Sequence, residues 1–331
     1  MPPQAAAIAR DAWPSLPYGA WKDTCATLHM WTQIVGKVRM QMTPPQNHWW
    51  HVPLYVSARG LTSSLVPGGA SGFEIELDFL DHQLHVRAAS GAAERLPLRS
   101  RSVAAFYREL MEVLHSLGIG AAIWTRPQEV VPAIPFDRDE THASYDPEYA
   151  RRLWEVLRSS DRVFRRFSSR YKGKCSPIHF FWGSFDLAVT RFSGRPAPEH
   201  PGGVPGLADW VAREAYSHEV SSAGWWPGGE TFPEPAYYSY AYPEPAGYRD
   251  APVKPAEAVY HEPLREFILP YEAVRRSADP DETLMAFLQS TYEAAAGRGR
   301  WDRPALERAP VPGGSVRAPR RPVRVKAPAP G

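Results

Sequence analysis

Strict alternation of apolar and acidic positions marks residues 73–79, which read FEIELDF. A strand with one buried face has this period of two, because successive side chains point to opposite sides of the sheet. Two further apolar residues, Leu84 and Val86, follow a short polar stretch with the same spacing. The pattern predicts a β-hairpin over residues 73–86.

Four other segments repeat their apolar residues at the spacing of an α-helix. They predict helices over about residues 21–34, 102–117, 147–170 and 281–296. Suitable residues to cap three of the helix starts are Ser102, Asp146 before Pro147, and Asp279 before Pro280. Two of the helices should end at glycine, Gly118 and Gly297.

The chain contains two similar segments, GKVRMQMTPPQNHWWHVPLYVSARG at residues 36–60 and GKCSPIHFFWGSFDLAVTRFSG at residues 173–194. Each has a Gly-Lys pair, a proline in the lead-in, a histidine followed by two large aromatic residues, and an apolar stretch. Counted from His48 and from His179, alternate positions form an apolar face and a more polar face in both segments. We therefore predict a strand after each histidine and an internal repeat in the chain.

The predicted elements divide the chain into two related units. We expect an α+β fold of two tandem modules, each an antiparallel sheet with two flanking helices, packed with pseudo-twofold symmetry. Further strands are expected near residues 121–131, 212–224 and 237–242, and proline-rich loops at 196–205 and 227–263. The expected boundaries are 13–118 for the first module, 119–146 for a connecting segment, 147–305 for the second module, and 306–331 for a disordered basic tail.

Composition excludes several classes of protein. The 331 residues include only two cysteines, too few for a disulfide scaffold or a four-cysteine zinc site. The chain has neither an apolar run of about 18 residues nor an N-terminal secretory signal, so we expect a cytoplasmic protein that does not enter a membrane. The net charge of +2 includes five cationic side chains after residue 309, which leaves −3 for the rest and does not suit a nucleic-acid binder.

Familiar catalytic and metal motifs are weak here. His48 and His51 have the spacing H-x-x-H, but on a strand they point to opposite faces and cannot share an ion. A metal could still use His51, His218 and Glu219 together; without a spacing signature we predict no metal and no cofactor. Cys175 is near two lysines, which would lower the pKa of its thiol, but an incidental small residue in a loop explains it better.

The richest set of chemical groups lies in residues 179–195 and 216–228. Asp186 stands in an otherwise apolar strand, where a carboxylate is costly to bury without a partner such as Arg191 or Arg195. That pair could equally be a structural clamp between the modules. His218 and Glu219 place an imidazole beside an acid, which suits acid–base catalysis, or a solvent-exposed pair.

Aromatic residues suggest the walls of a ligand site. Tyr240 belongs to the alternating stretch YYSYAY at residues 237–242, which could line a ligand or fill the core. Trp182 and Trp225 lie in the same part of the sequence. We expect His51, Trp182, Trp225 and Tyr240 to contact a ligand, with Arg59 and Arg191 as contacts for an anion.

Three segments, NHWWHVPLYVSARGLTSSLVP, SPIHFFWGSFDLAVTRFSGR and EAYSHEVSSAGWWPGG, resemble a bacterial family of unknown function. The resemblance covers roughly residues 13–305 and implies a cytosolic bacterial protein, without assigning an activity. It directs attention to these segments as the place to look for a site.

These observations lead to three hypotheses of different classes. The first is an enzyme that uses Asp186, His218 and Glu219 for acid–base chemistry on a small polar or anionic organic molecule. The second is a non-catalytic protein that binds a small ligand in the same aromatic cleft. The third is an interaction module that uses the Pro- and Tyr-rich loops.

Overall fold

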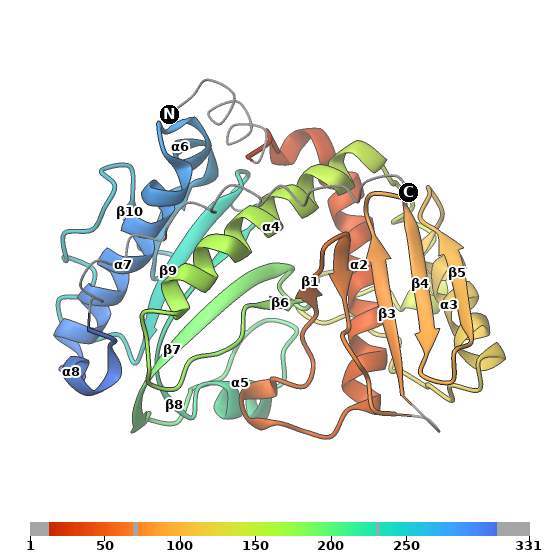
Figure 1. The fold of residues 1–331 in the computed structure, drawn as a ribbon, viewed down its shortest axis with the longest axis horizontal. Coiled ribbons are helices and arrows are strands. Elements are labelled where there is room, and N and C mark those ends of the chain that lie inside the picture. The colour runs from red at the N-terminus through yellow and green to blue at the C-terminus, as the bar shows by residue number, and fades with distance from the viewer. Residues whose placement is uncertain (1–12, 69–71, 230–231, 310–331) are drawn as a thin grey trace, which may run out of the picture.

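The computed structural model describes residues 13–68, 72–229 and 232–309, which form two antiparallel sheets with helices packed against them. Figure 1 shows the smaller sheet beside the larger one, with α4 (Pro147–Ser168) crossing in front of β9 (Ala236–Tyr242). The arrangement confirms the expected α+β class. The pseudo-twofold symmetry and the module boundaries remain predictions, and residues 310–331 of the expected tail lie outside the described residues.

The first sheet has five strands in sequential order. They are β1 Tyr55–Val56, β2 Gly60–Thr62, β3 Phe73–Asp78, β4 Gln83–Ala88 and β5 Ala93–Pro97. The register from Phe73 opposite Ala88 to Asp78 opposite Gln83 confirms the predicted hairpin. Ile75, Leu77 and Leu84 are fully buried, as the alternation requires.

The second sheet has six strands in the order β10-β11-β9-β8-β7-β6. They are β6 His179–Phe181, β7 Asp186–Pro196, β8 His218–Trp226, β9 Ala236–Tyr242, β10 Val259–His261 and β11 Glu266–Pro270. Successive neighbours are antiparallel. The predicted strand at 237–242 is confirmed, and β10 lies inside the expected proline-rich loop 227–263.

The helices are α2 Tyr18–Met42, α3 Val103–Ser116, α4 Pro147–Ser168, α5 Asp209–Ala215, α6 Tyr271–Arg276, α7 Pro280–Arg298 and α8 Arg303–Leu306, with short 3-10 turns η1 Asn47–Trp49 and η2 Phe136–Arg138. Three predicted caps are confirmed. The side chains of Ser102, Asp146 and Asp279 accept hydrogen bonds from backbone N–H groups in the first turns of α3, α4 and α7. Among the described residues no helix is both long and apolar enough to cross a membrane.

One face of the second sheet is covered by α4 and α7. Leu187, Trp225 and Tyr237 pair across three adjacent strands and are fully buried toward these helices. The Tyr237 hydroxyl lies 2.8 Å from the hydroxyl of Ser160 on α4. Because side chains alternate along a strand, Asp186 and Ala188 point to the opposite face, away from the helices.

The strand expected from His48 onward is wrong. Residues 47–49 form η1, in which His48 and Trp49 have φ of 56° and 62°, and only Tyr55–Val56 pair as a strand. The turn is held by tertiary contacts, since the Trp49 indole N–H donates to the carbonyl of Val211 at 3.1 Å. Long-range packing therefore outweighs the local pattern here.

The second expected strand is real but interrupted. A turn at residues 182–185, with Phe185 at φ 58°, separates β6 from β7. The two similar segments nevertheless meet, because Leu54 and Phe180 exchange backbone hydrogen bonds of 2.9 and 2.8 Å. This bridge joins the edges of the two sheets.

Two further expectations are corrected. Residues 209–215, DWVAREA, form α5 instead of a strand, and the following strand begins only at His218. This stretch contains good helix formers, so its local preference agrees with the structure. Residues 121–131 are described and form no strand.

Candidate functional site

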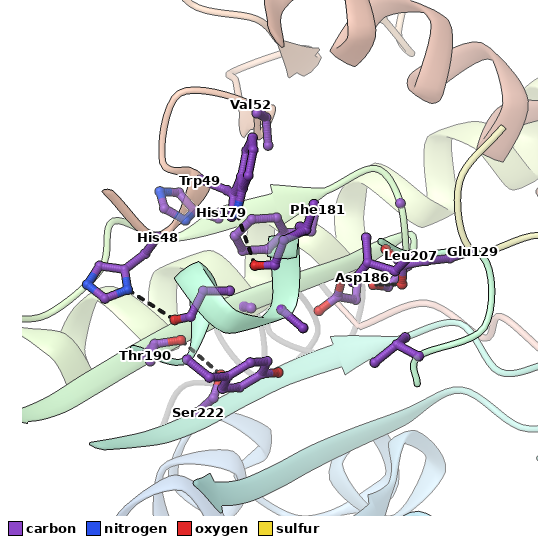
Figure 2. A pocket seen from close by; sticks show the side chains of 18 of the residues that line it. His48, Trp49, Val52, Glu129, His179, Phe181, Asp186, Thr190, Leu207 and Ser222 are labelled. Atoms are coloured by element: carbon purple, nitrogen blue, oxygen red, sulfur yellow. Dashed lines mark hydrogen bonds between the residues drawn. The ribbon is translucent and has the colours of Figure 1, made fainter. Parts of the chain in front are cut away.

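A cavity of about 610 Å³ lies on the face of the second sheet that the helices leave uncovered (Figure 2). Its floor consists of side chains from β6, β7, β8, β9 and β11. Residues 48–52, residues 124–129 and α5 lie over the floor and enclose the space. The volume falls within the range of about 300–1,000 Å³ that is typical of small-molecule sites.

Aromatic side chains dominate the walls. Six tryptophans line the cavity, namely Trp49, Trp50, Trp124, Trp182, Trp210 and Trp226. At the mouth, Trp124 and Trp210 remain 67% and 61% exposed, and Leu264 is 39% exposed. Large apolar side chains exposed at the rim of a concave site are typical of a ligand entrance.

Asp186 begins β7 and points into the cavity, with 7% of the residue exposed. It accepts a hydrogen bond from the Tyr238 hydroxyl on β9. Burial raises the pKa of Asp186 to about 7, and the nearby Glu129 carboxyl also raises it, whereas the Tyr238 bond opposes the change. Asp186 can therefore gain or lose a proton near neutral pH.

Two more carboxyls line the same cavity. Figure 2 shows Glu129 close to Asp186 and Leu207. The Ser184 hydroxyl donates to Glu129 at 2.8 Å, and burial raises the pKa of Glu129. Burial, together with the charge of Asp186, raises the pKa of Glu266 on β11 to about 8. Within the described chain, none of the three is ion-paired with an Arg, Lys or His.

His179 lies on the same floor with only 1% of its surface exposed. Neither ring nitrogen has a hydrogen-bond partner among the described residues. Burial lowers the pKa of His179 to about 3, so the imidazole is neutral and can donate one hydrogen bond and accept another. His179 pairs with Ala188 and Asp186 pairs with Phe181, which makes His179 and Asp186 diagonal neighbours about 7–8 Å apart at Cα.

Hydroxyl pairs and a histidine complete the polar lining. The Thr190 and Ser222 hydroxyls lie 2.9 Å apart, and those of Tyr216 and Tyr240 lie 2.7 Å apart. His48, in contrast to His179, is fully paired. Its Nδ1 lies 3.0 Å from the Ala215 carbonyl oxygen and its Nε2 lies 2.6 Å from Lys174 Nζ, so Nδ1 donates and Nε2 accepts.

The structure places three of the expected site residues in the cavity, Asp186, Trp182 and Tyr240. Trp182 is held by a hydrogen bond of 2.9 Å from its indole N–H to the Val52 carbonyl. Gly36 on α2 makes room for it, because a Cβ added there would lie 2.1 Å from the Trp182 ring. The similar segments thus contact each other at the cavity wall.

The expected acid–base partners lie elsewhere. Leu187 pairs with Trp225 and Pro196 pairs with His218, which separates Asp186 from His218 by roughly 25 Å at about 3.3 Å per residue. The His218 ring instead lies 5.6 Å from the His48 ring. Glu219 forms an ion pair of 2.7 Å with Arg195. The geometry does not bring Asp186, His218 and Glu219 together as one catalytic group.

The two arginines expected to contact an anion, Arg59 and Arg191, interact with other residues outside the cavity. Arg59 is paired with Asp78 and with Asp81 in the first sheet. Arg191 points to the helix side of the second sheet, where its guanidinium lies over Phe167 at 3.4 Å and donates to the carbonyl of the same residue. Alternation keeps Arg191 away from Asp186, so the expected clamp is not formed.

Two expected ligand contacts prove to be core residues. Trp225 is fully buried on the helix side of the second sheet. His51 is 3% exposed and accepts a hydrogen bond of 3.1 Å from the backbone N–H of Gln46. Neither residue contributes to the lining of the cavity.

Other reactive groups do not form a second site. In the described residues no three His, Cys, Asp or Glu side chains are arranged to hold a metal ion. Cys25 is buried in α2, and burial raises its pKa. Burial raises the pKa of Cys175 to about 11, despite the nearby Arg191, so this thiol is a poor nucleophile at neutral pH.

Sequence reasoning missed four of the polar residues of the cavity as site residues: Glu129, His179, Tyr238 and Glu266. His179 was recognised only as part of the repeat and Tyr238 as part of a tyrosine stripe. Glu129 and Glu266 carry no local signal, because one lies in an irregular segment and the other at the start of a short strand. Only the folded chain brings them into the same cavity as Asp186.

Comparison with known proteins gives a family and nothing more specific. A family model described as "Family of unknown function (DUF5996)" matches residues 13–308. No curated protein and no solved structure matches the chain.

Proposed function

The chain belongs to DUF5996, a family of unknown function, and we propose that it binds a small organic molecule in the cavity on its second sheet. The carrying observation is the combination of an apolar, tryptophan-lined space of about 610 Å³ with the unpartnered imidazole of His179 at its floor. A buried polar group without a partner costs free energy, roughly 1–3 kcal/mol, which a ligand hydrogen bond would remove. A cytoplasmic location remains part of this proposal.

A cavity-filling variant tests this proposal. In Ala188→Phe a phenyl ring would occupy the floor between His179 and Thr190, since Ala188 is 5% exposed and lines the cavity. Ala93→Phe is the matched control, because Ala93 is exposed on β5 of the other sheet. We expect the neutral probe 1-naphthylmethanol to bind the wild type and the control, with binding lost in Ala188→Phe, as measured by isothermal titration calorimetry.

Native mass spectrometry of the purified protein complements this test. A bound small molecule should appear on the wild type and on Ala93→Phe and should be absent from Ala188→Phe. If the wild type neither carries a small molecule nor binds the naphthyl probe at millimolar concentration, the cavity is not a ligand site and the proposal is wrong.

Acid–base catalysis is the second candidate function, and one observation favours it. Asp186 combines a pKa of about 7 with a hydrogen bond from Tyr238, which suits proton transfer to or from a bound molecule near neutral pH. The test is deuterium incorporation into the co-purified ligand in deuterated water. Incorporation with the wild type and its loss in Asp186→Asn would support catalysis, and equal incorporation in both would leave binding alone.

A further inference from the structure

We propose that the ligand of this cavity is an organic cation, an ammonium group on an apolar body, whose charge lies among Asp186, Glu129 and Glu266. This inference rests on the proposed function and adds the chemical class of the ligand. It differs from the anionic ligand expected from the sequence, because the two arginines assigned to that role lie outside the cavity.

The first argument is a group of carboxyls that lack a cationic partner. Glu129 comes from the loop before η2, Asp186 from β7 and Glu266 from β11, so three separate elements direct carboxyls into one cavity. The neighbours that act on Asp186 are Tyr238, which donates a hydrogen bond to it, and Glu129, whose like charge repels it. Buried carboxylates in proteins are normally paired with a cation, and here the described chain supplies none.

The second argument is the nature of the walls. Tryptophan faces attract cations through the ring quadrupole, and the effect is strongest where water is excluded. Two of the tryptophans that line the cavity lie near Asp186. Trp182 is close to it in sequence, in the turn before β7, and Trp226 is close to it in the register between β7 and β8. Carboxylates together with aromatic faces are the usual recognition elements for organic ammonium groups.

The third argument is independent of charge. His179 is buried and neutral, and neither ring nitrogen has a partner in the part of the chain that the structure describes. It lines the same cavity about 7–8 Å from Asp186 at Cα. That separation fits a ligand with a second polar atom two or three bonds from its ammonium group. Because no three of these side chains are arranged as metal ligands within the described residues, an organic cation fits better than a metal ion.

Three probes of similar size but different charge provide the test. We would compare the binding of 1-naphthylmethylamine, 1-naphthylmethanol and 1-naphthoate to the full chain at pH 8 by isothermal titration calorimetry. The expected order is amine, then alcohol, then carboxylate, with the amine at least about tenfold tighter than the alcohol. Because the pKa values of Asp186 and Glu266 are about 7 and 8, amine binding at pH 7 should also release protons, seen as a dependence of the heat on buffer.

Matched variants identify the carboxyls responsible. Glu266→Gln and Asp186→Asn should each remove most of the preference for the amine while the alcohol binds as before. Glu219→Gln is the control, because Glu219 lies on the same sheet but is paired with Arg195 outside the cavity. It should leave the preference unchanged.

The outcomes separate this inference from the function on which it rests. If the alcohol binds as tightly as the amine, or the naphthoate binds best, the ligand is not a cation although the cavity still binds ligands. The same conclusion follows if Asp186→Asn and Glu266→Gln keep the full amine preference. If none of the three probes binds the wild type at millimolar concentration, the proposed function itself fails.

Discussion

Each of the two sheets buries an aspartate at the end of a strand, and the surroundings of the two aspartates differ. Asp78 ends β3 and is 1% exposed; it accepts hydrogen bonds from the backbone N–H groups of Leu80 and Asp81 at 2.8 and 3.0 Å, and from Arg59. Asp186 begins β7, is 7% exposed and, among the residues the structure describes, has the Tyr238 hydroxyl as its one side-chain donor.

The pKa values of the two carboxyls shift in opposite directions. Burial would raise the pKa of Asp78, but the hydrogen bonds from Arg59 and the two backbone groups outweigh it and hold the pKa below its ordinary value. For Asp186 burial prevails, and the pKa rises to about 7. The difference suggests that Asp78 stabilises the fold, whereas the carboxyl of Asp186 is available to bind a ligand.

The largest loss of stability should come from removing the structural aspartate. Asp78→Ala should lower the free energy of unfolding by about 3 kcal/mol, because two backbone N–H groups and Arg59 lose their acceptor in a buried turn. Urea unfolding followed by tryptophan fluorescence at pH 7 measures this. A loss below about 1 kcal/mol would mean that water replaces the carboxylate and that the contrast between the sheets is overstated.

Removing the second aspartate should have the opposite sign. In the wild type the folded pKa of Asp186 lies above its unfolded value, so between about pH 4 and 7 the folded chain binds more protons and loses stability as the pH rises. Asp186 thus contributes up to about 1.4 kcal/mol per pH unit to the change of the unfolding free energy with pH, and Asp186→Asn removes this contribution.

We therefore expect Asp186→Asn to be similar to the wild type near pH 4 and more stable than it at pH 8 by up to about 4 kcal/mol, since the slope acts over roughly three pH units. Urea unfolding at a series of pH values measures the difference. Parallel stability profiles for the two proteins would show that Asp186 is not perturbed by its surroundings.

Two buried histidines extend the comparison at a smaller scale. His48→Phe should cost about 1.5 kcal/mol, because the Ala215 carbonyl and Lys174 each lose a partner. His179→Phe should instead raise the free energy of unfolding by about 1–2 kcal/mol, because it removes a buried polar group that has no partner among the described residues. Thermal unfolding of the two variants side by side provides the measurement, and an equal loss for both would contradict the unpartnered state of His179.

The smallest effect is expected at Glu219. Glu219 forms an ion pair with Arg195, whose side chain is 47% exposed. Exposed ion pairs contribute little to the stability of the fold. Glu219→Gln should change stability by less than about 0.5 kcal/mol, and the change should shrink further in 1 M salt. A larger loss in chemical unfolding would show that the pair has a structural role that its exposure does not suggest.

How far the sequence predicts the structure depends on the range of the interactions involved. The helices starting at Val103, Pro147 and Pro280 were predicted because their caps, Ser102 among them, act within one turn. The turn at residues 182–185 was missed because Trp182 and Phe185, on either side of Gly183 and Ser184, continue the aromatic pattern of the strand. In the same way, η1 depends on the contact between Trp49 and Val211, more than 150 positions later in the chain.

The same limit applies to the cavity. Asp186 was predicted because a carboxyl within an apolar strand is conspicuous in the sequence itself. Its neighbours Glu129 and Glu266 lie far from it along the chain, and nothing local distinguishes them from solvent-exposed acids. His218 and Glu219 were chosen for their chemistry, but register along β8 decides which residues can meet Asp186, and register is a property of the whole sheet.

The pKa of Asp186 tests the central claim most directly. In protein labelled with ¹³C at the aspartate side-chain carboxyls, Asp186 and Asp78 can be assigned from the resonances lost in Asp186→Asn and Asp78→Asn. Titration should place Asp186 near pH 7 and Asp78 below its ordinary range. A titration of Asp186 near pH 4, close to that of an unperturbed aspartate, would mean that water in the cavity solvates its carboxyl. The proposal that Asp186 binds a cationic ligand would then be wrong.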